Sequence, residues 1–128
     1  TGFLANYDAY HNLDFLVRIK NKVDKTKILD TLKIVGLGEA GKKKVGKFSM
    51  GMKQRLAIAQ AIVEDQEILI LDEPMNGLDN QGVKEMRELF LLMKERGCTI
   101  LLASHNKEDI EVLCDKVFEM ESGKLNEK

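Results

Sequence analysis

The sequence lacks several features that would assign it to a special class of protein. It contains no Trp, one Pro and two Cys, and aromatic residues make up only 5% of it. No apolar run approaches the roughly 18 residues that a membrane-spanning helix needs. The formal net charge is −1, so no overall field would collect nucleic acid or an anionic membrane surface. What remains, 128 residues of which 44% are hydrophobic, is typical of one ordered domain or a piece of one.

The two cysteines do not form a recognisable chemical motif. Cys98 and Cys114 are too far apart for a CxxC redox or zinc site. We expect both to be small buried hydrophobic residues of a protein in a reducing cytosol. The chain opens on Thr1 rather than Met, and we expect it to be a piece of a longer protein.

Residues 68–74 combine an apolar run with charge. Four aliphatic residues are followed directly by Asp72, Glu73 and Pro74. This pattern predicts a strand that is buried on both faces and that delivers two carboxylates to its C-terminal end, where open α/β sheets bind ligands. In nucleotide hydrolysis one such carboxylate can hold the metal while the other orients or deprotonates a water. The alternative is a core strand that happens to end in an acidic turn, and the strand alone leaves both open.

The chain divides into a helical half and an alternating half. Helical spacing and capping residues predict helices over about 8–20, 24–35 and 49–63. From residue 65 onward strands and helices alternate, with a long helix that begins at Asp79 or Asn80. That alternation predicts a parallel sheet with right-handed crossovers over residues 65–128.

One glycine-rich segment imitates a phosphate-binding loop. Gly36, Gly41 and Lys42 have the spacing of GxxxxGK[ST], but Lys43 stands where a hydroxyl is required. The segment also follows a predicted helix, whereas a phosphate-binding loop follows a strand. We interpret it as a solvated basic connection.

Four segments together resemble the motifs of the ATP-binding cassette (ABC) ATPase family, in the family's order and approximate spacing. Residues 49–55 are similar to its signature motif, 68–73 to its Walker B strand, 76–79 to its D-loop, and 104–105 to its switch histidine. The resemblance covers the whole chain. It implies that residues 1–64 are the helical subdomain. It also implies that residues 65–128 are the C-terminal half of a P-loop NTPase-like α/β core, present as an incomplete parallel sheet with flanking helices.

The resemblance implies catalytic roles for three residues. Asp72 would help to hold Mg²⁺, through water, and Glu73 would be the general base for the attacking water. His105 would contact the γ-phosphate of ATP. The other histidine, His11, matches no motif, and we expect it to be a surface or helix-packing residue.

The resemblance also implies that part of the site acts on a partner. Ser49 and Gly51, with Met52 beside them, would contact ATP held by the opposite protomer of a head-to-tail dimer. Asp79 would lie at that dimer interface. Met50 and Met52 stand where the family has a glycine and a glutamine, and methionine at the second position resembles the branch of drug, bacitracin-type and lantibiotic exporters.

The functional expectation is an ATP-binding and ATP-hydrolysing subunit that drives a separate transmembrane permease. Such a subunit would lie in the cytoplasm, on the inner face of the cell membrane, without a nucleic-acid partner. The Walker A loop, the Q-loop glutamine and the adenine-stacking aromatic of the family lie upstream of Thr1, so this chain alone is expected neither to bind ATP well nor to hydrolyse it. The missing strand is expected to leave sheet edges unpaired, which favours oligomerisation or swapped elements.

Two alternatives remain open. One is a non-transport ABC ATPase of DNA repair or translation, although no long insertion or second cassette is present in this sequence. The other is a truncated, non-catalytic interaction module that completes a partner's ATP site.

Overall fold

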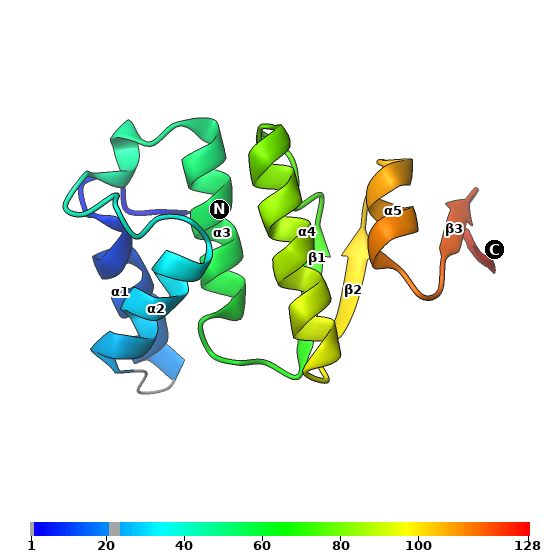
Figure 1. Cartoon of the computed structure of the whole chain (residues 1–128), viewed down its shortest axis with the longest axis horizontal. Coiled ribbons are helices and arrows are strands. Elements are labelled where there is room, and N and C mark those ends of the chain that lie inside the picture. Colours follow the sequence, from blue (N-terminus) through cyan, green and yellow to red (C-terminus); the bar gives the residue numbers. More distant parts are fainter. Residues whose placement is uncertain (1, 21–23) are drawn as a thin grey trace.

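The structure is a computed structural model that describes residues 2–20 and 24–128. Three helices lie at one end of the molecule, a long helix and two strands occupy the middle, and a short helix and a hairpin lie at the other end (Figure 1). The elements in chain order are α1 (Ala9–Lys20), α2 (Lys25–Ile34), the 3₁₀ turn η1 (Val45–Lys47), α3 (Met50–Ile62), β1 (Ile68–Asp72), α4 (Asn80–Glu95), β2 (Thr99–Ala103), α5 (Lys107–Leu113), β3 (Phe118–Glu121) and β4 (Lys124–Glu127).

The three predicted helices of the first half are present, and their caps explain where they begin. The side chain of Asp24 accepts a hydrogen bond from the Lys27 backbone N–H at the start of α2, and Ser49 does the same for Met52 at the start of α3. Gly36 follows α2 with φ +84°, in the left-handed region that glycine adopts readily. The apolar faces of these helices form a common core, which includes Leu13, Val17, Ile28, Leu32, Val35 and Leu56.

β1 and β2 pair in parallel, with Ile68 opposite Thr99 and Asp72 opposite Ala103. Leu69 and Leu71 point into the core that Met86 and Phe90 of α4 also enter.

The prediction that β1 is buried on both faces is wrong for this chain. Ile68 is 63% exposed and Ile70 70% exposed, and Leu101 of β2 is 63% exposed. The reason is that helices cover only one face of the strand pair within the described ranges.

The third predicted strand does not join the parallel sheet. β3 pairs instead with β4 in an antiparallel hairpin. Ser122 and Gly123 connect the two strands with φ of +50° and +78°, as in the two-residue turns that match strand twist. A tight hairpin forms through local contacts, whereas a parallel partner would have to be reached by a crossover. The part of the chain that the structure describes supplies only β1 and β2 as parallel strands.

The expectation that both cysteines are buried is not fully met, because Cys98 and Cys114 are each partly exposed. Each lies at the end of an element, Cys98 just before β2 and Cys114 as the C-cap of α5. Burial raises the pKa of the Cys114 thiol, and the neighbouring charge of Asp115 adds to this effect. The thiol is therefore held in its protonated, less reactive form. Across the described ranges, no helix has the length and apolar character needed to cross a membrane.

A buried ion pair fixes α5 to α4. Arg87 donates from Nε and Nη2 to Oδ1 of Asp109, at 2.8 and 2.6 Å. The Asp109 side chain is 4% exposed and that of Arg87 is 19% exposed. Removing one partner of a buried pair leaves the other charge without compensation, which is costly even where the intact pair contributes little net stability.

Replacing Asp109 with alanine is therefore expected to lower the free energy of unfolding by roughly 3 kcal/mol. The matched control is Asp115→Ala, because Asp115 pairs with Lys94 at 3.1 Å but is 76% exposed. That control should cost no more than about 1 kcal/mol. Urea denaturation of both variants measures the difference, and equal losses would show that the Arg87 pair is not the stronger link.

Candidate functional site

The two predicted carboxylates lie at the C-terminal end of the parallel strand pair. Asp72 is the last residue of β1 and is exposed. The backbone N–H of Glu73 donates to the Ala103 carbonyl at 2.8 Å, which extends the pairing by one residue. Glu73 then turns sharply with φ +46°, a left-handed conformation that non-glycine residues rarely adopt. Such strain persists only where the surroundings hold it, and it is often found at functional sites.

Glu73 and His105 form a direct pair across the ends of the two strands. Oε1 of Glu73 accepts the backbone N–H of His105 at 2.9 Å and lies 2.6 Å from Nδ1 of its ring. A carboxylate at Nδ1 favours the tautomer with the proton on that nitrogen, which leaves Nε2 directed elsewhere. The His105 side chain is fully exposed, whereas that of Glu73 is 28% exposed. The structure thus brings together two residues that are 32 positions apart and that the sequence assigned to one site.

The start of α3 packs against the loop that follows Glu73. Oγ of Ser49 accepts the Met52 backbone N–H at 3.1 Å. A Cβ added at Gly51 would lie 3.1 Å from the Gly77 carbonyl oxygen. Conversely, a Cβ at Gly77 would lie 2.7 Å from Cγ of Met50. Both glycines therefore allow a close approach between α3 and this loop.

Asp79 is the N-cap of α4. Its Oδ1 accepts the Gly82 backbone N–H at 2.7 Å. The capping role predicted from the sequence is confirmed, whereas its place at a dimer interface stays a prediction.

Two residues of α3 that sequence reasoning did not single out also hold the site together. Gln54 donates from Nε2 to the Pro74 carbonyl at 2.7 Å. Arg55 donates from Nη1 to the Val35 carbonyl at 2.9 Å and to Oε2 of Glu85 at 2.8 Å. These partners are 20 to 30 positions away in the chain, so no local pattern pointed to them.

The remaining candidates lie apart from the carboxylates. His11 is 51% exposed and its Nδ1 lies 2.6 Å from Asp8 Oδ1, which confirms the expectation of a surface residue. The basic residues at 42–44 are exposed, as expected of a solvated connection. No group of three or more His, Cys, Asp or Glu side chains in the described ranges could hold a metal by itself.

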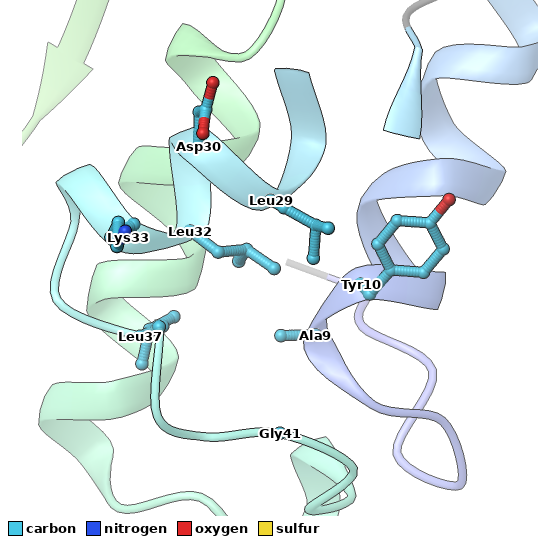
Figure 2. Close-up of a pocket in the computed structure, with 9 residues that line it drawn as sticks. Ala9, Tyr10, Leu29, Asp30, Leu32, Lys33, Leu37 and Gly41 are labelled. Atoms are coloured by element: carbon cyan, nitrogen blue, oxygen red, sulfur yellow. The ribbon is translucent and has the colours of Figure 1, made fainter. Parts of the chain in front are cut away.

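A shallow groove lies between α1 and α2. Leu29 and Leu32 point toward Ala9 and Tyr10 across a volume of about 230 Å³ (Figure 2). Its walls are mostly apolar, and none of the predicted site residues lines it.

Comparison with known proteins decides the family. The pattern that describes the ABC transporter family matches residues 3–76. The chain belongs to the ABC transporter family.

Relatives agree with this assignment. The chain is 50% identical over 122 residues to an uncharacterized ABC transporter ATP-binding protein, YybJ, of Bacillus subtilis, covering 95% of the chain and 56% of the relative. It is 51% identical to the bacitracin transport ATP-binding protein BcrA of Bacillus licheniformis, covering 99% of the chain and 42% of the relative. It is 41% identical to the lantibiotic transport ATP-binding protein SrtF of Streptococcus pyogenes, covering 94% of the chain and 52% of the relative. The chain spans about half the length of these relatives.

Solved structures confirm the fold. A dimeric bacterial ABC transporter cassette superposes with a TM-score of 0.85 at 22% identity, over 97% of this chain and 56% of that one. The cbiO1 protein of Clostridium perfringens, part of an ABC transporter complex, gives a TM-score of 0.77 at 32% identity. The superposition covers 96% of this chain and 50% of that one. The resemblance to an ABC ATPase of the bacitracin and lantibiotic branch is thus confirmed.

Substitution at Gly77 tests the close approach between α3 and the loop. Gly77→Ala places a Cβ against Met50 at φ +79°, whereas Gly123→Ala imposes similar backbone strain at φ +78° with no atom within 4 Å. We expect the control to cost about 1 kcal/mol through backbone strain alone and Gly77→Ala to cost more. Denaturation measures the loss of stability in each variant, and the methyl NMR resonance of Met50 reports whether its side chain moves. Equal costs with an unmoved Met50 resonance would contradict the packing.

The ionisation of Glu85 gives a pH-dependent test. Hydrogen bonds from Arg55, and then from Gln81, hold the pKa of Glu85 below its ordinary range. Because the folded pKa is lowered, the stabilisation is fully present above the unfolded pKa and is lost as pH falls through the folded pKa. Arg55→Gln is expected to raise the titration midpoint of the Glu85 carboxyl carbon in ¹³C NMR. The exposed C-cap change Arg96→Gln should leave it unchanged, and a midpoint insensitive to both changes would remove Arg55 as the cause.

Proposed function

We propose that this chain supplies the signature helix, the Walker B carboxylates and the switch histidine of an ATP-hydrolysing ABC transporter subunit. The observation that carries the proposal is the Glu73–His105 pair at the carboxyl end of a parallel strand pair, in a chain of this family. A nucleotide-hydrolysing site needs a group that orients or deprotonates water beside groups that stabilise charge on the phosphates. Glu73 fits the first role and His105 the second.

The donors present fit a magnesium ion that accompanies the nucleotide. Mg²⁺ usually keeps several waters and takes one or two protein carboxylates plus phosphate oxygens. Asp72 offers one exposed carboxylate beside Glu73, which matches a site completed by water and nucleotide. When bound, the ion would neutralise charge on the phosphates. Asp72 is the residue that would hold it.

The signature end of α3 is proposed to serve a neighbouring site. Ser49 and Gly51, with Met52, lie at an exposed or half-exposed helix N-terminus, where backbone N–H groups and the helix dipole favour an anion. In a head-to-tail dimer they would contact the γ-phosphate of ATP held by the second subunit, and Asp79 would lie at that interface. One of the solved structures of similar fold is that of a dimeric ABC transporter cassette.

We further propose that the whole subunit drives a separate transmembrane permease from the cytoplasmic face of the membrane. The names of two relatives refer to bacitracin and lantibiotic transport, so antibiotic peptides are the proposed substrate class. A DNA-repair or translation ATPase is the less favoured alternative, because the relatives named above are transport proteins or transporter ATP-binding proteins.

The decisive variant is Glu73→Gln in a subunit that joins this sequence to a phosphate-binding loop. We expect kcat for ATP hydrolysis to fall by about a hundredfold or more, because general-base contributions are of that size, while MgATP still binds. Glu67→Gln is the matched control, since Glu67 is exposed and precedes β1 at its opposite end.

If the Glu73→Gln variant hydrolyses ATP as fast as the Glu67→Gln control, the catalytic assignment of Glu73 is wrong. An upstream reading frame without GxxxxGK[ST] would favour the truncated interaction module instead.

A further inference from the structure

Gln54 makes contacts that the proposed roles of the signature helix do not account for. It lies on α3, five residues after the capping Ser49. Its Nε2 donates to the Pro74 carbonyl at 2.7 Å and lies 3.5 Å from the Glu73 carbonyl oxygen. The first distance is that of a strong hydrogen bond, and the second is at the outer limit of one. Gln54 therefore holds the chain mainly at the carbonyl of Pro74, the residue that directly follows Glu73.

This contact matters because of the backbone conformation of Glu73. A residue at φ +46° needs neighbours that hold it there. On its N-terminal side the Glu73 N–H is fixed to Ala103 at 2.8 Å, and its side chain is fixed to His105. On its C-terminal side, the backbone carbonyls of Glu73 and Pro74 accept side-chain hydrogen bonds from Gln54.

We infer that Gln54 is a positioning residue for Glu73: the signature helix fixes the Glu73–Pro74 backbone and thereby directs the Glu73 carboxylate toward His105. The inference rests on the proposed function, in which Glu73 is the general base. Gln54 touches neither water nor nucleotide in this scheme. It acts by keeping the strained turn in the conformation that brings Oε1 to the backbone N–H and ring of His105.

A spectroscopic test reports the positioning without requiring catalysis. The His105 amide proton donates to Glu73 Oε1, so its ¹H shift reports that hydrogen bond. Gln54→Met keeps the length of the side chain but removes the donor. We expect the His105 amide resonance of the ¹⁵N-labelled chain to move most of the way toward its position in Glu73→Ala. In Gln54→Lys, where an ammonium can again donate to the Pro74 carbonyl, the resonance should return toward its original position.

Gln60→Met is the matched control. Gln60 lies on the same helix and is similarly half-buried, and the structure gives its side chain no hydrogen bond to another described residue. The control should leave the His105 resonance in place.

The kinetic arm uses the subunit that contains a phosphate-binding loop. Gln54→Met is expected to lower kcat by about tenfold to a hundredfold, the range that small misplacements of a catalytic group can cause. KM for MgATP should stay unchanged, because no ground-state contact is removed. Gln60→Met should leave both parameters unchanged.

Each outcome separates the inference from the proposed function. If Gln54→Met behaves like Gln60→Met in the spectrum, the positioning role is wrong while the ATPase proposal stands. A Gln54→Met spectrum altered throughout the chain would indicate a purely structural role and would also overturn the inference. If Glu73→Gln leaves hydrolysis intact, the ATPase proposal fails, and the His105 resonance still shows whether Gln54 positions Glu73.

Discussion

The parallel pairing of β1 with β2 is the constraint on which the site depends. In-register pairing places Asp72 beside Ala103, and the next backbone hydrogen bond draws Glu73 alongside the end of β2. His105 lies just after the end of β2, where its backbone N–H donates to the Glu73 carboxylate. A shift of one residue in this register would send alternate side chains to the opposite face and separate the pair. The geometry of Glu73 and His105 is thus a consequence of strand register, which the burial of Leu69 and Leu71 helps to fix.

Local chemistry made much of this structure predictable. Ser49 and Asp79 cap the helices that the sequence assigned to them, and the strand that ends at Asp72 begins and ends close to its expected limits. These features depend on residues within one turn or one strand, so their patterns are complete in a short window. The pairing of Glu73 with His105 was predictable through the family resemblance, which placed two distant motifs in one site.

One kind of feature that the sequence did not reveal depends on distant partners. Gln54 and Arg55 read as ordinary polar positions of a helix, and only the folded chain shows that they reach Pro74, Val35 and Glu85. The separation of β3 from the parallel sheet was missed for a different reason. A strand pattern predicts extended backbone but does not specify its partner, and here a tight turn decided the pairing.

The uncovered face of β1 shows how composition and environment can differ. Ile68 and Ile70 have the character of a strand covered by helices on both faces, as parallel sheets usually are. In this chain they are mostly exposed, together with Leu101 on the neighbouring strand. Apolar residues that lie together on one exposed face mark a surface suited to burial against further protein.

The helix α3 links the two kinds of role proposed for the chain. Its first turn carries Ser49 and Gly51, proposed to act on a partner's nucleotide, and its second turn carries Gln54, which holds the backbone beside Glu73. A helix of 13 residues moves largely as one body, because its backbone hydrogen bonds are internal. Any displacement of Ser49 is therefore transmitted to the Glu73–Pro74 turn over little more than one helical turn. Because Gln54 reaches the Pro74 carbonyl at 2.7 Å, the helix proposed to contact a partner's nucleotide also holds the turn that carries the proposed general base.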